Sequence, residues 1–198
     1  MRIKKLVKSA VSFTAGSLLG LMLFVPWGGA ASLMSAVVSC EAAAKGIKLE
    51  ITEASAEGIF SPRFKFNGIK ADMAPVSLNI SQIEVRPHIV KTLANRDLYA
   101  SVFAGSGKID GRPVGTIVWR SAKAESVVTE DAVVLKNIKT DGDIKAEGYM
   151  ELSKDGKIIK SDMAVTVPQK FDSIIKAVSI IGSLPLKNSA PGEWRIKK

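Results

Sequence analysis

The most constraining feature of this sequence is a long stretch near its N-terminus without any charged residue, from Ser9 to Cys40. Its first part, Ser9–Trp27, is long enough to cross a bilayer, which takes roughly 20 mostly apolar helical residues. Trp27 suits the membrane–water interface, and basic residues precede the stretch: Arg2, Lys4, Lys5 and Lys8. By the positive-inside rule the N-terminus is then cytoplasmic and the rest of the chain is exported. We therefore predict a single-pass transmembrane helix at residues 9–27.

Two other interpretations use the same residues and stay open. A cleaved signal peptide has a basic start, an apolar core and small residues before the cleavage point, and Gly28 and Ala30 supply such residues. A lipoprotein would be modified at Cys40, because Val37–Cys40 is compatible with a lipobox. We favour the retained anchor, since its apolar core exceeds the roughly 7–15 residues usual for a signal peptide and Cys40 lies well beyond that core.

The residues after the span divide into a helical connection and a β-rich domain. The connection is rich in alanine, places Leu33, Val37 and Ala44 on one helical face and ends in Lys45-Gly46, a common helix C-terminus. From Ile47 the apolar residues recur with a period of two, as in half-buried strands. The predicted organisation is a cytoplasmic N-terminus at 1–8, the span at 9–27, a connecting helix at 28–46 and an exported β-rich domain at 47–198.

Alternation of apolar and polar residues predicts a series of strands in this domain. The two clearest run from Ile144 to Leu152 and from Ile159 to Val167. Others are predicted at 47–52, 63–67, 76–85, 98–108, 114–120, 124–129, 132–139 and 193–198. Asp-Gly pairs at 110–111, 141–142 and 155–156 indicate short turns, which join antiparallel rather than parallel strands. The predicted fold class is therefore mainly β, an antiparallel meander.

One strand contains a change of phase. Val76, Leu78 and Ile80 alternate on even numbers, whereas Ile83 and Val85 continue on odd numbers. A slip by one residue turns every following side chain to the other side of the sheet. We therefore expect a bulge or bend at residues 81–82, between the two runs.

Two short helices are expected between the strands. The first starts at Pro87, carries Ile89, Val90 and Leu93, and stops at Asn95. The second runs from about residue 169 to 181 and has a stripe of apolar residues at helical spacing: Phe171, Ile174, Ile175, Val178 and Ile181. Such a stripe must be covered, so we expect the second helix to lie on an open end or face of the sheet.

The residues that carry most enzyme chemistry are scarce. The chain has one histidine, His88, and one cysteine, Cys40, so the usual metal-ligand sets and Ser-His-acid or Cys-His arrangements have no candidate. Gly105–Lys108 superficially looks like a phosphate-binding loop, but Ile109 stands where that motif needs Ser or Thr. After the four basic residues near the N-terminus, the chain has 24 basic and 19 acidic residues, and this net charge of +5 is spread out, without a basic stripe or stacking aromatics. We predict no catalytic residue, no metal, no cofactor and no nucleic-acid partner.

The order of these features resembles a known family. The anchor ends in Pro26-Trp27, and the alanine-rich helix leads to EITEASAEGIFSPRFKFNGIKADM at 50–73 and ISQIEVRPHIVKTLANRDLYASVFAGSGKIDG at 80–111. This pattern of glycines, Pro87 and apolar alternation, from the anchor to roughly Arg120, is similar to the type II secretion system protein N family and its AsmA-like relatives. A weaker similarity recurs in the last third of the chain, around Leu184–Leu186.

The resemblance implies a bacterial inner-membrane protein with a single span and a periplasmic sheet, curled into a groove or an open jelly-roll-like arrangement. It supplies no catalytic residues, so we expect a protein that is not an enzyme. It implies an accessory or structural role in type II protein secretion through protein–protein contacts, with secretion-system subunits or related envelope proteins as partners. The alternative is an AsmA-like lipid-binding or lipid-transfer module with membrane lipids as ligands.

For the lipid-binding alternative, the strands offer a candidate apolar groove. Its predicted lining is Phe64, Phe66, Leu78, Ile80, Met163 and Val165. The same residues would also suit an ordinary closed core, which is the commoner environment of apolar strand residues. The sequence leaves open which protein is the partner, whether lipid is bound, and the oligomeric state.

Overall fold

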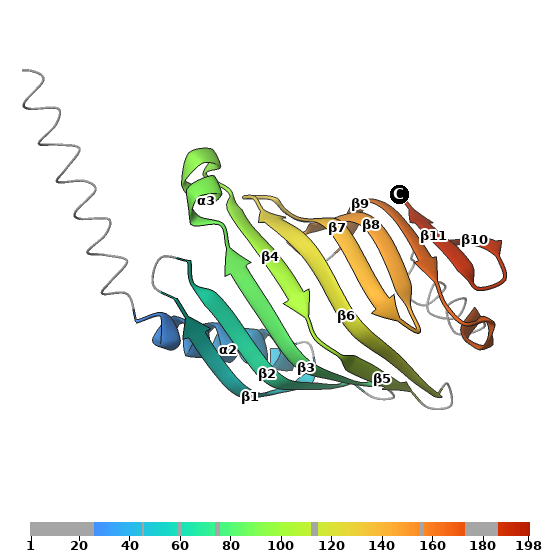
Figure 1. Ribbon diagram of the computed structural model, residues 1–198, viewed down its shortest axis with the longest axis horizontal. Helices are drawn as coiled ribbons and strands as arrows, with labels where there is room; N and C mark the ends of the chain where they lie inside the picture. The colour runs from blue at the N-terminus through green and yellow to red at the C-terminus, as the bar shows by residue number, and fades with distance from the viewer. Residues whose placement is uncertain are drawn as a thin grey trace, which may run out of the picture.

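The computed structural model describes residues 26–44, 46–58, 61–73, 76–111, 115–154, 157–172 and 186–198. Most of them lie in antiparallel strands of one sheet, as the sequence predicts (Figure 1). The elements are, in chain order, α2 (Trp27–Ala44), β1 (Lys48–Glu57), β2 (Arg63–Met73), β3 (Val76–Pro87), α3 (Ile89–Asn95), β4 (Leu98–Ala104), β5 (Gly107–Gly111), β6 (Gly115–Val128), β7 (Ala132–Gly142), β8 (Lys145–Ser153), β9 (Ile158–Thr166), the 3-10 helix η1 (Gln169–Phe171), β10 (Leu186–Ala190) and β11 (Glu193–Lys197).

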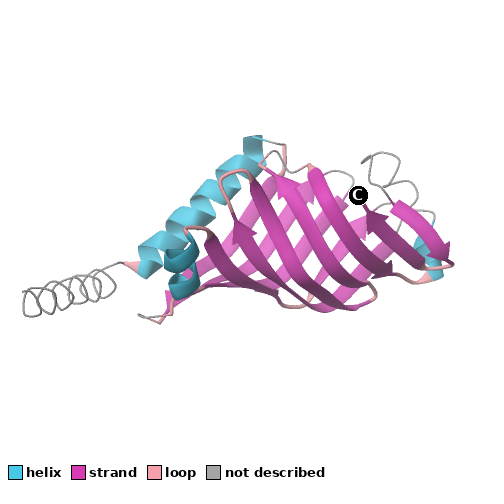
Figure 2. Ribbon diagram, turned by 90° about the horizontal axis from the view of Figure 1, so that it is seen from above, coloured by secondary structure: helices cyan, strands magenta, loops and turns pink. Residues whose placement is uncertain are grey.

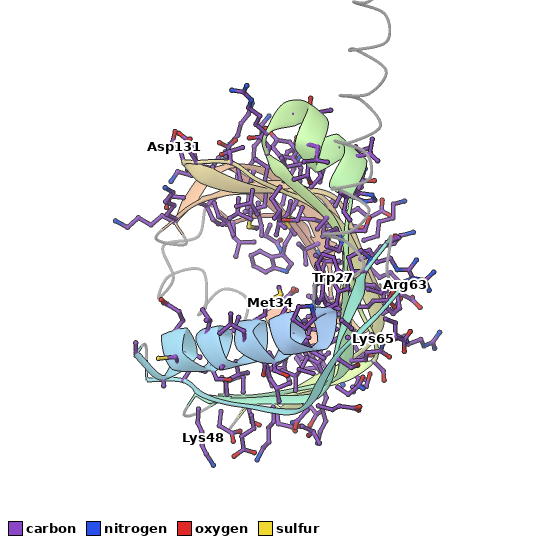
Figure 3. All side chains as sticks on the ribbon, turned by 90° about the vertical axis from the view of Figure 1, so that its left-hand side faces the viewer. Trp27, Met34, Lys48, Arg63, Lys65 and Asp131 are labelled. Atoms are coloured by element: carbon purple, nitrogen blue, oxygen red, sulfur yellow. The ribbon has the colours of Figure 1, made fainter. Side chains whose placement is uncertain are left out.

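The sheet is a meander in which neighbours along the chain are mostly neighbours in space. Its strand order is β1-β2-β3-β4-β6-β7-β8-β9-β11-β10, and β5 pairs with β3 and β6 in line with β4. Figure 2 shows the strands crossing the molecule obliquely, with α2 along one end. Figure 3, viewed from that end, shows that the sheet is strongly curled and that α2 lies on its concave side.

β2 and β3 bend together at neighbouring positions. The two strands pair in a single register throughout, yet Ile80 and Ile83 both pack into the same apolar cluster, as do the residues opposite them. Residues three apart share a side only if the strand slips by one, so both strands change phase together. In β2 the slip falls at Gly68, which has a φ of +60°. The bend predicted at Ser81-Gln82 is confirmed.

Beside this bend, β4 ends and β5 begins. The sequence predicts one strand at 98–108, but the structure interrupts it at Gly105-Ser106. There the backbone N of Ser81 donates to O of Ser106 and N of Gly105 donates to O of Gln82, both at 2.8 Å. Conversely, the strands predicted at 114–120 and 124–129 are one long strand, β6, which takes up its irregularities as shifts of register against β7.

β10 is not among the predicted strands. Its sequence, LKNSA, has no apolar alternation, and it becomes a strand by pairing with β11 at the end of the sheet. The helix predicted at 169–181 is described only at its start, where Gln169–Phe171 form η1, and residues 173–185 lie outside the described ranges.

α2 and α3 occupy the positions of the predicted connecting helix and first short helix. α2 begins at Trp27, one residue before the predicted boundary. α3 begins at Ile89 rather than Pro87, because Pro87 is still the last residue of β3 and pairs with Ala100. The division of the chain at 8, 27 and 46 stays a prediction.

The predicted membrane span at 9–27 lies outside the described residues, except for Pro26 and Trp27. In the part of the chain that the structure describes, no helix is both long and apolar enough to cross a membrane. Trp27 itself is the first residue of α2 and packs against the sheet.

Candidate binding groove

The concave side of the sheet carries all six predicted groove residues. Residues opposite each other on paired strands point to the same side. Such pairs can be followed from strand to strand between Phe66 on β2 and Met163 on β9. All residues along this line lie on one side of the sheet: Phe66, Ile83, Ala104, Ala122, Thr140, Ile138, Gly148 and Met163. The structure therefore places the six residues on one side, but in two groups, one on β2 and β3 and the other on β9.

The two phenylalanines of the first group are covered by α2, whereas Leu78 is half-buried and outside the cluster beneath that helix. Phe64 and Phe66 are 5% and 9% exposed and form a cluster with Ile69 and Ala31, the last a fully buried residue of the helix. The indole of Trp27 meets the ring of Phe64 edge-on, with ring centroids 6.1 Å apart. The protein's own helix thus occupies the concave side at this end of the sheet.

The second group lies near the C-terminal strands. Met163 is buried and packs with Ala146 and Ile196. Val165 is half-buried and also contacts a neighbouring cluster around Phe171 and Trp194. The two ends of the concave side therefore each have a packed apolar core.

Asp172 holds the C-terminal core together. Its carboxylate accepts a hydrogen bond from Nε1 of Trp194 at 2.8 Å and from the backbone N of Gly192 at 3.0 Å. Hydrogen bonds to a charged acceptor are roughly twice as strong as neutral ones. The residue that follows η1 is thereby fixed to the hairpin of β10 and β11.

The larger apolar residues of α2 point away from the strands that the helix covers. Leu33, Met34, Val37 and Val38 are 66%, 41%, 53% and 52% exposed, whereas Ala31 is buried. Figure 3 shows Met34 directed toward the inside of the curl. The helix therefore packs on the sheet through Trp27 and the small residues Ala30 and Ala31. Leu33 and Val37, which the sequence places on one helical face, lie on its exposed side.

Small and medium apolar residues line the middle of the concave side. They come from β4, β6, β7 and β8 and are only half-buried: Val102, Ala104, Ala122, Ala124, Leu135 and Met150. α2 packs mainly on β1 and β2 and, within the described residues, does not extend over these middle strands. Together with the four exposed residues of α2 they form an apolar lining inside the curl, which we call the inner apolar surface.

A charged hollow of about 510 Å³ lies on the convex side. Phe103, 43% exposed, lies between Glu84 and Lys123 in the strand pairing, and Lys139 also lines the hollow. Glu84 is buried, and its hydrogen bond from Arg86 holds the pKa of the Glu84 carboxyl below its ordinary value. The hollow is therefore lined by charges of both signs, Glu84 and Glu125 beside Arg86, Lys123 and Lys139.

His88 lines the same hollow and shares a hydrogen bond of 2.8 Å with Oγ of Ser101. Across the described ranges, no group of three or more His, Cys, Asp or Glu side chains is placed to hold a metal ion. The thiol of Cys40 is exposed on α2. The surfaces described here therefore offer apolar contact on the concave side and polar, charged contact on the convex side.

The protein therefore belongs to the class of domains built from one curled antiparallel sheet. A helix packs on the concave side of this sheet, and apolar residues line the inside of the curl. A family model described as "Type II secretion system protein GspN-like, Synergistales" matches residues 4–198. The chain therefore belongs to the GspN-like family of type II secretion system proteins, which confirms the resemblance found in the sequence. No curated protein and no solved structure matches the chain.

Sequence reasoning did not find the inner apolar surface. Alternation alone marks which residues of a strand share a side, but it does not say which strands α2 covers and which it leaves open. Ala104, Ala122 and Ala124 also give little apolar signal, because alanine is common on both sides of a sheet. That the six predicted residues line a ligand groove stays a prediction.

Proposed function

We propose that this protein is an accessory or structural subunit of a type II secretion system and acts by protein–protein contact. It is anchored in the bacterial inner membrane by residues 9–27, with its N-terminus in the cytoplasm and its sheet in the periplasm. The observation that carries the proposal is the family match over nearly the whole chain. The charge distribution supports the topology, because four basic residues precede the apolar stretch and all acidic residues follow it.

The edges of the sheet are the surfaces best suited to a protein partner. Among the described strands, none pairs with the outer side of β1 or of β10. An extended segment can add to such an edge through main-chain hydrogen bonds. β1 is the longer of the two and exposes one basic and three acidic residues: Lys48, Glu50, Glu53 and Glu57. Charged residues discourage indiscriminate pairing at an edge, and the excess of glutamate favours a partner segment with basic residues.

Site-specific photocrosslinking in cells tests this proposal. A photoreactive residue at Lys48 or Glu57 on β1, or at Asn188 on β10, is expected to capture subunits of the secretion apparatus. A matched probe at Arg120, which is exposed on the inner strand β6, is expected to capture none. Deletion of the gene is expected to reduce export of type II substrates. Normal export together with an absence of crosslinks to secretion subunits would contradict the accessory role.

The anchor has a separate test. The full chain is expected to stay with the membrane on carbonate extraction and to retain residues 1–40 in its intact mass. A cleaved signal peptide would instead give a shortened mass, for example one starting at Ala31. Quantitative release into the soluble fraction would contradict the anchor.

The inner apolar surface favours a second function, the binding or transfer of membrane lipids. In the part of the chain that the structure describes, its residues are exposed or half-buried, and exposed apolar surface of this kind usually marks a binding site. Mass spectrometry of the full chain in mild detergent tests this function: stoichiometric phospholipid supports it. An environment-sensitive dye on Cys40, which lies on the exposed part of α2, is expected to shift its emission when such lipid is added. No bound lipid and no shift would leave only the accessory role.

A further inference from the structure

An apolar patch is exposed at the end of the sheet where β3 passes through α3 into β4. On α3, Val90 and Leu93 are 82% and 64% exposed. On the adjoining strands Leu98 is 51% exposed, and Val128, which pairs with it, is 37% exposed. We call these four residues the end patch. Val90 and Leu93 lie beyond the end of the strands, whereas Leu98 and Val128 lie on the same side of β4 and β6 as Ala104 and Ala122 of the inner apolar surface.

Basic side chains border the end patch. Lys91 on α3 and Arg96 at the C-cap of α3 are both exposed, and α3 itself contains no acidic residue. The acidic residues nearest in sequence to the four residues of the end patch are the buried Glu84, the half-buried Asp97, and Glu125, Glu130 and Asp131 on either side of Val128. Figure 3 shows Asp131 to the left of α3, at the same upper side of the curl. Exposed apolar residues beside lysine and arginine are typical of short helices that lie on anionic membrane surfaces.

The chain enters the domain at the same end of the sheet. Trp27, the first residue of α2, contacts Phe64, and Phe64 pairs with Val85 on β3. Val85 stands two residues before Pro87, and α3 follows directly. Figures 1 and 2 both show α3 and the start of α2 at one end of the molecule. Residues 9–25, the apolar part of the proposed anchor, therefore join the domain close to the end patch.

We propose that the end patch rests on the lipid surface that the anchor enters. Val90 and Leu93 lie at the boundary of headgroups and acyl chains, and Lys91 and Arg96 lie beside the phosphates of anionic lipids. This inference rests on the proposed anchor. A bilayer is the occupant that fits, because the chain itself crosses into one beside the patch. Contact at α3 in addition to the anchor fixes the tilt of the sheet, so that its α3 end is membrane-proximal and the hairpin of β5 and β6 is distal.

Depth-dependent fluorescence quenching on the full chain tests this docking. In a Cys40→Ser background, Val90→Cys carries the probe NBD in vesicles of phosphatidylcholine and phosphatidylglycerol, with and without doxyl-labelled lipid. Val118→Cys is the matched control, because Val118 is also an exposed valine (45%) but lies on β6 near the hairpin with β5. The expected result is a blue-shifted emission at position 90 that doxyl lipid quenches, and no quenching at position 118. Lys91→Glu with Arg96→Glu is expected to reduce the quenching at 90 more in these vesicles than in pure phosphatidylcholine.

Flotation of the same vesicles separates the two proposals. If the protein floats with the vesicles but position 90 behaves like position 118, the anchor stands and the docking is overturned. If the protein does not float, the anchor fails and the docking with it. Quenching at position 90 that grows with the number of proteins per vesicle, without doxyl lipid, would mean that the patch contacts a second copy of the chain and would also overturn the docking.

Discussion

The indole of Trp27 meets the ring of Phe64 edge-on, with 6.1 Å between ring centroids and 70° between ring planes. This contact joins the first residue of α2 to the start of β2 and fixes the point at which the chain reaches the sheet. Phe64 is buried as a result. Among the described residues, the buried Nε1 of Trp27 has no hydrogen-bond partner, so the indole contributes here through its apolar surface.

Phe64→Ala is expected to lower the free energy of unfolding by about 3–5 kcal/mol, because it leaves a cavity beneath α2. Trp27→Phe is expected to cost much less than Trp27→Ala, since it keeps an aromatic contact and removes the unpaired N–H. Urea unfolding of the full chain in mild detergent measures these changes. Phe103→Ala is the control, because Phe103 is exposed on the convex side and its loss should change stability by about 0.5 kcal/mol or less. Equal effects at positions 64 and 103 would contradict the cover by α2.

Asp172→Ala is expected to lower the free energy of unfolding by roughly 1.5–3 kcal/mol, because hydrogen bonds to a charged acceptor are lost and the N–H of Trp194 loses its partner. Asp162→Ala is the matched control. Asp162 also accepts two hydrogen bonds, from Arg195 at 2.9 and 3.1 Å, but this pair is exposed, so its loss should cost at most about 1 kcal/mol. Chemical denaturation followed by tryptophan fluorescence compares the two. A larger loss at position 162 would show that Asp172 does not hold the C-terminal core.

Gly148→Ala is expected to destabilise the sheet by roughly 2–5 kcal/mol. Gly148 has a φ of +143°, and a Cβ there would collide with the backbone carbonyl of Asp162 on β9. Gly28→Ala is the control: it lies in α2 with nothing within 4 Å of an added Cβ, and alanine in a helix is favoured over glycine by up to about 1 kcal/mol. Thermal unfolding should therefore shift in opposite directions for the two variants. A tolerated alanine at position 148 would mean that β8 and β9 lie farther apart than the structure has them.

The pair of Glu84 and Arg86 predicts part of the acid response. The hydrogen bond from Arg86 lowers the pKa of the Glu84 carboxyl in the folded state. A lowered folded-state pKa contributes stability above the unfolded pKa, about 4.3 for glutamate, and this contribution is lost as pH falls through the folded value. Glu84→Gln and Arg86→Gln are therefore each expected to flatten the fall of stability on the acid side. Denaturation midpoints measured over a series of pH values test this, and curves parallel to the wild type would contradict the pairing.

Much of the fold follows from local pattern. The alternation in residues 144–152 and 159–167 predicts β8 and β9, because an apolar side chain at every second position has one side of a sheet to bury it. The change of phase between Ile80 and Ile83 predicts the bend for the same reason. Family membership is also visible in the sequence, since the order of the apolar N-terminal stretch, the glycines and Pro87 can be recognised without any knowledge of contacts.

Other features depend on partners distant in the chain. β10 is a strand only because β11 pairs with it, and the break between β4 and β5 exists because Gly105 and Ser106 bond to the bend in β3. The candidate groove shows the same division. Sequence alone determined which strand residues are apolar and which of them share a side, because that depends on a period of two along one strand. Only the tertiary structure decided that α2 covers Phe64 and Phe66 and leaves its own Leu33 and Val37 exposed. Whether an apolar residue is covered depends on the strand order and on the curl of the sheet, and both are set by contacts between segments that are distant in the chain.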